Sequence, residues 1–202
     1  MPVLTIIAGP NGAGKSTHSK ELLSESGIEA FDFDKEFYAI WGQFSFDPAI
    51  EQGAYNRAQE RYLERRTEAL DQDKSFAFET NYHTDDLLRV IDLFKSKGYR
   101  TELIFICLET PELAIERVKQ RVLKGGHFVD EATIKTRFDS GLRLLDKTFQ
   151  KFDLVTIYRS EQNLVQLAYV LEPEKNAFTV LSGIPSSLRP FLNHLLDFPT
   201  FN

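Results

Sequence analysis

The clearest chemical signal in the sequence is a glycine-rich segment close to its start. It matches the pattern G-x-x-x-x-G-K-[ST], and its residues are Gly9, Pro10, Asn11, Gly12, Ala13, Gly14, Lys15, Ser16 and Thr17. Glycines let the backbone curl so that successive N–H groups point inward and bind phosphate oxygens. In this pattern the lysine reaches the β- and γ-phosphates and the serine hydroxyl ligates Mg²⁺. The segment therefore predicts a phosphate-binding loop for a nucleoside triphosphate, with Lys15 as a catalytic cation and Ser16 as the metal ligand.

Other nucleotide-binding classes fit the sequence less well. Gly9, Gly12 and Gly14 do not have the G-x-G-x-x-G spacing of a dinucleotide site. No Asn-Lys-x-Asp guanine reader occurs, so ATP is the expected nucleotide, although GTP stays open. Residues 181–185 depart from the Leu-Ser-Gly-Gly-Gln signature of ABC-type ATPases, and 202 residues is short for a motor. These differences favour a kinase.

Two aspartates, Asp32 and Asp34, lie at and just after the end of a short apolar segment, residues 28–33, which is a candidate for the second strand. In a parallel sheet the carboxyl ends of the strands converge on the bound phosphate. Asp34 is therefore predicted to be the general base that takes a proton from an acceptor hydroxyl, and Asp32 is a second candidate. The alternative for Asp34 is a structural role as the cap of a helix that starts at Lys35.

Glu79 ends another predicted strand, at residues 75–78. A carboxylate at this edge of the sheet could contact Mg²⁺ through water, or it could hold the acceptor. The alternative is an exposed carboxylate at a strand end. Thr80 and Asn81 follow directly and could add hydrogen bonds to the acceptor.

Residues 111–140 have the composition of a lid. Arg117 and Arg121 are four residues apart, so they share one face of a predicted helix. A Gly-Gly pair then breaks the helix, and His127 and Arg137 follow. Phosphoryl-transfer enzymes need cations over the transferring group, and a mobile lid often delivers them. Arg117 and Arg121 are therefore catalytic candidates, and His127 and Arg137 are lid or substrate candidates. The alternative is a solvated, charged helix face.

Composition argues against several classes of protein. The formal net charge of −6 disfavours non-specific nucleic-acid binding, which depends on releasing counterions from phosphates. No apolar run approaches the roughly 18 residues of a membrane helix, and no signal peptide is recognisable. Cys107 lies in an apolar run and is expected to be a buried thiol in a cytoplasmic protein. We find no zinc-ligand spacing. His18 is expected at the surface or in packing, and His83 and His194 without carboxylate partners.

Aromatic residues are concentrated between residues 31 and 46. Such a set is more often core than a substrate platform. Tyr38 or Trp41 could still stack on a sugar or a base.

Alternating strand and helix patterns must position these residues. Buried strands are predicted at residues 3–8, 75–78, 101–108 and 153–158, with strands or a hairpin at 164–171 and 177–181. Helices are predicted at residues 15–25, from Asp47-Pro48 to about 73, 84–97, 111–124, from 130 or 131 through 149, and 186–196. The alternation predicts an α/β P-loop NTPase fold, with a mainly parallel sheet, helices on both faces and a helical lid. One domain is expected over residues 1–202, with a C-terminal appendage at about 162–202.

Taken in order, these segments resemble the zeta-toxin family of P-loop kinases. The resembling pieces span residues 3–160 and are the phosphate-binding loop, Phe33-Asp34, Phe78-Glu79-Thr80, Arg117-Val118-x-x-Arg121-Val122-x-x-Gly125-Gly126-His127-x-Val129 and Arg137-Phe138. The Gly-Gly-His stretch after the paired arginines is the most specific piece. Where the family often has Asp-Asn-Ser after the late strand, this chain has Tyr158-Arg159-Ser160.

The resemblance implies a kinase for UDP-N-acetylamino sugars such as UDP-N-acetylglucosamine, and a possible antitoxin-like protein partner. It implies the following roles: acceptor base for Asp34, phosphate clamp for Lys15, Mg²⁺ ligand for Ser16, acceptor contact for Glu79, and transition-state cation for Arg117 or Arg121. The sequence as a whole predicts an ATP- and Mg²⁺-dependent phosphotransferase acting on a hydroxyl of a small molecule. The alternative is an ATP-binding interaction module or ATPase that works with an antitoxin-like protein and transfers nothing to a small molecule.

Overall fold

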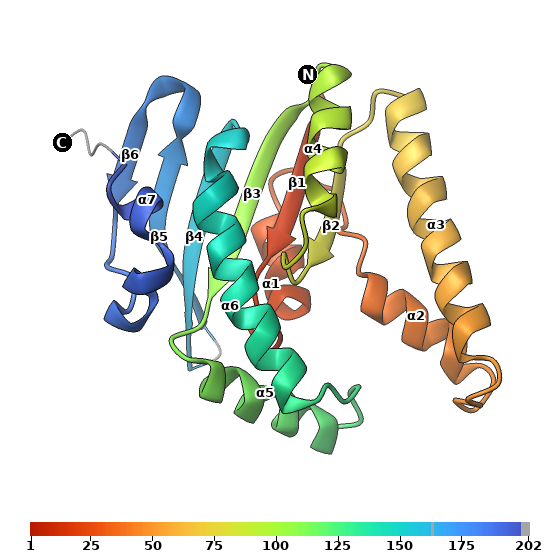
Figure 1. The fold of residues 1–202 in the computed structure, drawn as a ribbon. Helices are drawn as coiled ribbons and strands as arrows, with labels where there is room; N and C mark the ends of the chain where they lie inside the picture. Colours follow the sequence, from red (N-terminus) through yellow and green to blue (C-terminus); the bar gives the residue numbers. More distant parts are fainter. Residues whose placement is uncertain (163, 199–202) are drawn as a thin grey trace.

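The computed structural model describes residues 1–162 and 164–198 and contains a six-stranded sheet (Figure 1). In spatial order its strands are β2 (Phe76–Thr80), β1 (Val3–Ala8), β3 (Arg100–Cys107), β4 (Leu154–Glu161), β5 (Leu164–Glu172) and β6 (Ala177–Val180). The first four strands pair in parallel, and β5 and β6 continue the sheet antiparallel. The prediction of a mainly parallel α/β sheet is confirmed, and its two last segments form a hairpin.

Helices connect the strands and flank the sheet. The α-helices are α1 (Lys15–Leu22), α2 (Phe33–Gly42), α3 (Glu51–Asp71), α4 (Asp86–Ser96), α5 (Pro111–Leu123), α6 (Glu131–Thr148) and α7 (Asn193–Leu196). Short 3₁₀ turns are η1 (Phe149–Lys151), η2 (Pro173–Lys175) and η3 (Ser186–Phe191). Figure 1 shows α4 and α6 in front of the sheet, α3 beyond β2, and α5 below the carboxyl ends of the parallel strands.

The central strands are apolar along most of their length because both faces of the sheet are covered. Leu4, Ile6 and Ile7 of β1 and Leu103 of β3 are fully buried. Cys107 at the end of β3 is buried as expected, and burial raises the pKa of its thiol to about 12. This thiol is therefore part of the packing and has no nucleophilic character at neutral pH.

The expected second strand at residues 28–33 does not form. Phe31 alone bridges to β2, through its N–H to the carbonyl of Ala77 and its carbonyl to the N–H of Glu79. The chain then enters α2, because the Asp32 side chain accepts a hydrogen bond from the Lys35 N–H at 3.0 Å and caps the helix. A helix cap at the end of the apolar segment thus ends the pairing after one residue.

The long third helix begins later than Asp47-Pro48 predicts. Asp47 instead forms a turn in which its carboxylate accepts from the Ala49 N–H at 2.9 Å, and α3 starts at Glu51. The backbone just before this turn has positive φ at Phe46, which a helix cannot continue. Ile50, directly before α3, is consequently exposed.

The aromatic segment packs largely as core. Phe37 and Ile40 of α2 form a small apolar cluster with Ala54 and Ala58 of α3, separate from the main core around the sheet. Small alanines let the two helices approach closely. This cluster fixes α2, and therefore the first-turn residues of α2, relative to the rest of the fold.

The C-terminal residues dock on α6. Asp146 is buried, and its carboxylate accepts from the Leu195 N–H at 2.8 Å and contacts Nδ1 of His194 at 2.7 Å. The expectation that His194 lacks a carboxylate partner is wrong, because the pair joins residues 48 positions apart. Asn163 and residues 199–202, which belong to the expected C-terminal appendage, lie outside the described residues. None of the helices in the described ranges has the length and hydropathy that a bilayer crossing requires.

Candidate active site

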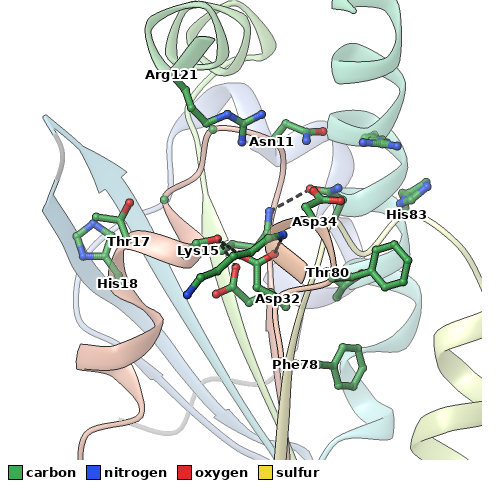
Figure 2. Close-up of a pocket in the computed structure, with 18 of the residues that line it drawn as sticks. Asn11, Lys15, Thr17, His18, Asp32, Asp34, Phe78, Thr80, His83 and Arg121 are labelled. Carbon is green, nitrogen blue, oxygen red and sulfur yellow. Dashed lines mark hydrogen bonds between the residues drawn. The ribbon is translucent and has the colours of Figure 1, made fainter. Parts of the chain in front are cut away.

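A cleft of about 1870 Å³ opens at the carboxyl edge of the parallel strands. The phosphate-binding loop, α2, the end of β2, α5 and α6 all contribute to its lining. Figure 2 shows Lys15, Asp32 and Asp34 converging in this cleft, with Arg121 extending toward it. The topology therefore gathers residues from segments more than 100 positions apart at one site.

The phosphate-binding loop is held against its neighbours by close backbone contacts. A Cβ at Gly9, where φ is +145°, would lie 2.4 Å from the carbonyl oxygen of Ile106. A Cβ at Gly12 would lie 3.0 Å from the carbonyl oxygen of Ala114 and 3.1 Å from Cβ of Arg117. The glycines are thus required both by the curl of the loop and by its packing on β3 and α5.

Lys15 extends back along the loop into the cleft. Its ammonium donates to the carbonyls of Gly9 at 2.8 Å and Pro10 at 3.2 Å, and to Oδ1 of Asn81 at 3.0 Å. Burial lowers the pKa of Lys15 to about 8, against the opposing effect of nearby carboxylates, of which Glu79 is the strongest. A bound polyanion would restore the charge of this group, as expected for a phosphate clamp. Asn81, which the sequence offered only as a further hydrogen-bonding residue, is therefore a direct partner of Lys15.

Ser16 lies between two carboxylates. Its Oγ is 2.6 Å from Oδ2 of Asp32 and 2.7 Å from Oε2 of Glu79. One hydroxyl has one proton, so it can donate to only one of them, and the other contact needs a proton or a cation between two oxygens. Burial raises the pKa of Glu79, and the charge of Asp32 raises it further. The alternative that Glu79 is an exposed strand-end carboxylate is wrong, because the residue is 9% exposed.

This oxygen cluster fits Mg²⁺. The ion prefers oxygen ligands and in nucleotide sites takes one or two carboxylates together with phosphate oxygens. Ser16, Asp32 and Glu79 supply such a set, and two oxygen contacts that share one proton are relieved by a cation. Asp32 lies as close to Ser16 as Glu79 does. The available sequence signal for this pair was the serine of the loop motif together with an aspartate at the end of the apolar segment 28–33.

Asp34 differs from both of these carboxylates. It lies in the first turn of α2, and its side chain is 48% exposed toward the cleft. The alternative of a helix cap at Asp34 is wrong, because Asp32 occupies that position. Its carboxylate Oδ2 lies 3.7 Å from Nε2 of His127. Asp34 is therefore the carboxylate of the site that remains accessible to an incoming hydroxyl.

The two arginines of α5 have different partners. Arg117 donates to Oγ of Ser160 at 2.7 Å and to the Gly12 carbonyl at 3.4 Å, which ties α5 to the phosphate-binding loop and β4. Arg121 donates from Nη2 to Nε2 of His127 at 2.9 Å and to its carbonyl at 3.1 Å. Both side chains line the cleft. The part played by Ser160 was not recognisable from the sequence.

The lid candidates also reach the cleft. The His127 ring stacks on Tyr38 of α2, with centroids 4.5 Å apart and an angle of 14° between the planes. Arg137 of α6 lines the same cleft. The pKa of His83 is lowered, first by burial and then by the charge of Arg137. Thr80 accepts from the N–H of Tyr82 at 3.0 Å and so shapes the turn after β2.

Comparison with solved structures shows the fold. A chain of the PezAT chromosomal toxin–antitoxin system of Streptococcus pneumoniae is 18% identical, with a TM-score of 0.63 over 96% of this chain and 79% of that one. A chain of the AvrRxo1-ORF1:ORF2 complex is 14% identical, with a TM-score of 0.68 over 98% of this chain. The complex with ATP gives a TM-score of 0.64 at 13% identity over 90% of this chain. This chain spans 65% and 61% of the AvrRxo1 chains that it matches in these two structures.

These likenesses show that the chain shares the α/β fold of these structures. No curated protein sequence matches the chain. The family model described as "AAA domain" (AAA_33) matches residues 4–140, from β1 into α6, and so includes the phosphate-binding loop and both arginines of α5. Since the match covers more than half of the sequence, the chain belongs to this AAA domain family.

Proposed function

We propose that the protein transfers the γ-phosphoryl group of ATP to a hydroxyl of a small molecule, with Mg²⁺ as cofactor. The observation that carries the proposal is the contrast between Asp34 and the two carboxylates beside Ser16. Asp32 and Glu79 contact Ser16, as metal ligands of a nucleotide site would, whereas Asp34 is half exposed and free of such a contact. A module that only binds ATP has no need for this accessible carboxylate. In hydrolysis the same carboxylate would activate water, so the stimulation of ADP formation by an acceptor separates transfer from hydrolysis.

Each residue of the cleft has its own role in the proposed phosphoryl transfer. Lys15 and the amides of the loop hold the β- and γ-phosphates, and Arg117 and Arg121 offset the charge that develops on the transferring group. Asp34 accepts the proton of the acceptor hydroxyl as its oxygen bonds to the γ-phosphorus. The bond from that phosphorus to the bridging oxygen breaks, and ADP leaves. Ser16, Asp32 and Glu79 would hold Mg²⁺, which would supply positive charge to offset that of the phosphates.

The leading acceptor is a UDP-N-acetylamino sugar, as the zeta-toxin resemblance implies. The toxin–antitoxin system among the similar structures supports testing an antitoxin-like partner as well. We also propose that residues 111–140 act as the lid over the site, within one domain formed by residues 1–202.

The reaction can be tested with the pure protein, ATP, Mg²⁺ and a panel of nucleotide sugars, sugars and nucleosides. We expect ADP formation to rise sharply with the right acceptor, and mass spectrometry to detect a phosphorylated product. If no acceptor stimulates ADP formation while ATP still binds, the alternative of an ATP-binding interaction module is favoured.

Asp34→Asn should separate binding from chemistry. We expect ATP affinity to stay close to that of the wild type and the transfer rate to fall about 10²- to 10⁴-fold, as for loss of a general base. Glu36→Gln removes a charge from the same helix at a residue outside the cleft lining and is the matched control. Full turnover by Asp34→Asn would remove Asp34 from the mechanism.

A further inference from the structure

Arg121 and Asp34 have opposite charges and lie close together, yet they do not form an ion pair. Each interacts with Nε2 of His127: Arg121 at 2.9 Å and Asp34 at 3.7 Å. Among the described residues no carboxylate lies within 4.0 Å of the Arg121 guanidinium, and its Nε is buried without a hydrogen-bond partner. A guanidinium and a carboxylate this close would otherwise tend to form a bidentate pair.

A direct pair would impair both groups. It would hold Asp34 in its ionised form and cover the oxygens that must accept a proton. It would also turn Arg121 away from the phosphate that is being transferred. His127 prevents this, because its carbonyl and its ring nitrogen both accept from Nη2 of Arg121.

The geometry requires a particular form of the histidine. A guanidinium has donors and no acceptor, so Nε2 must accept, and the proton of a neutral ring must be on Nδ1. Burial lowers the pKa of His127, and so do the charges of Arg121 and Arg137, while Asp34 and Asp32 oppose them. Burial and the two arginines therefore favour a neutral His127, against the effect of the two aspartates.

Little within the loop itself fixes the His127 ring. The backbone before the ring is held on α5, because the Gly126 N–H donates to the Arg121 carbonyl at 3.0 Å, but the residue after His127, Phe128, is 71% exposed. Tyr38 supplies the contact, because its ring is nearly parallel to that of His127 at 4.5 Å. Tyr38 is four residues after Asp34 on α2, so one helix face presents both the carboxylate and the ring.

We propose that Tyr38 is a positioning residue for phosphoryl transfer. By stacking on a neutral His127 it keeps that ring between Asp34 and Arg121, and it so preserves Asp34 as a free base and Arg121 as a cation available to the phosphate. The inference rests on the proposed function for the roles of Asp34 and Arg121, whereas the pose of His127 can be tested without any acceptor.

The first test is ¹⁵N NMR of the histidine rings in the complete protein without nucleotide, with the His127 signals assigned from His127→Gln. We expect the Nδ1–H tautomer in the wild type and in Tyr38→Phe, which keeps the ring. Tyr38→Leu, with Tyr38→Met as a second variant in case the first does not fold, should give averaged or shifted ring signals. An unchanged Nδ1–H signature in a folded variant without the ring would overturn the proposal.

The second test separates kcat from KM in the transfer reaction. In Tyr38→Leu we expect kcat to fall about tenfold or more, in line with small misplacements at active sites, and KM for ATP to change little. Tyr38→Phe keeps the ring and should keep the kcat of the wild type.

A double variant distinguishes positioning from a general structural role. If Tyr38 acts by keeping Arg121 available to the phosphate, Arg121→Gln should lower kcat much less in Tyr38→Leu than it does in the wild type. A kcat that is unchanged in Tyr38→Leu, or equally lowered in Tyr38→Phe, contradicts the proposal. If the wild type transfers nothing, the proposed function fails, and the NMR test still decides whether Tyr38 holds His127.

Discussion

At the scale of single residues, the site depends on charges placed where water is scarce. The Lys15 ammonium has three oxygen acceptors around it and is nevertheless destabilised by burial, which lowers its pKa to about 8. Ser16 contacts two carboxylates with a single proton. Both features are unfavourable in the free protein and are relieved by a polyanion and a cation, so ligand binding and the ionisation of these residues must be coupled.

The lowered pKa of Lys15 predicts a pH dependence of ATP affinity. The charged amine binds phosphate, and bound phosphate raises its pKa, so binding takes up a proton when the pH is above about 8. We expect affinity to be highest below pH 8 and to fall by up to about tenfold per pH unit above it. Calorimetry in buffers of different ionisation enthalpy measures the uptake directly. Lys15→Ala should bind weakly with no such uptake, and equal proton uptake by this variant would contradict the assignment.

Glu79→Gln should make the metal-free protein more stable and weaken its use of Mg²⁺. The pKa of Glu79 is raised in the folded protein, so without Mg²⁺ this group destabilises the fold increasingly as the pH rises from its unfolded value through its folded value. The glutamine should therefore raise Tm in metal-free buffer at pH 7 to 8, and raise the Mg²⁺ concentration for half-maximal activity by about 10- to 100-fold. Glu29→Gln, an exposed change of the same kind, should do neither. A lower Tm for Glu79→Gln would sink this account.

At the scale of elements, the loop between β1 and α1 is positioned by contacts with β3 and α5. Gly9 packs against the backbone of β3 at the Ile106 carbonyl, and Gly12 packs against Ala114 and Arg117 of α5. Arg117 also donates a hydrogen bond to the Gly12 carbonyl. The phosphate-binding loop is therefore part of a packed unit, and its conformation is set before a ligand arrives.

Gly9→Ala tests this packing against a matched substitution. At Gly98 φ is also positive, but a Cβ there meets nothing within 4 Å. Gly98→Ala should therefore lower the stability only by the backbone strain that it introduces, about 1–2 kcal/mol. Gly9→Ala adds a contact of 2.4 Å to a carbonyl oxygen, so β3 and the loop must separate. We expect a larger loss of stability in urea and loss of ATP binding by calorimetry. Equal effects of the two substitutions would show that the packing is unimportant.

At the scale of the whole molecule, the antiparallel hairpin and the C-terminal turns complete the fold on the side of the sheet away from β2. They are joined to α6 through Asp146, whose buried carboxylate bonds to residues of α7. Because α6 also carries Arg137 into the cleft, the C-terminal segment supports one wall of the site from behind.

Asp146→Ala should destabilise the whole chain. It leaves the buried N–H of Leu195 without a partner, which costs about 1–3 kcal/mol, and each kcal/mol lowers Tm by about 2–4 °C in a protein of this size. Asp139→Ala, an exposed change on the same helix, should alter stability by less than about 0.5 kcal/mol. Thermal unfolding followed by circular dichroism compares the two. Identical curves for both variants would mean that the C-terminal segment adds no stability.

The sequence by itself determined the phosphate-binding loop, the alternation of strands and helices, and the starts of α5 and α6, because each of these depends on residues a few positions apart. The two helices begin where the sequence predicts, with Thr110 and Asp130 as their N-caps. It also predicted that Cys107 is buried, from the apolar run around it.

Tertiary structure alone decided which distant side chains meet. Nothing local distinguishes Asp32 as a partner of Ser16 from Asp34 as an open carboxylate, since both follow the same apolar segment. The partners of Arg117, His127 and His194 likewise lie across the fold. The failed second strand has the same cause, because one bridge to β2 competes there with a helix cap. Contacts between segments depend on how helices and strands pack in three dimensions, and no short-range pattern records that packing.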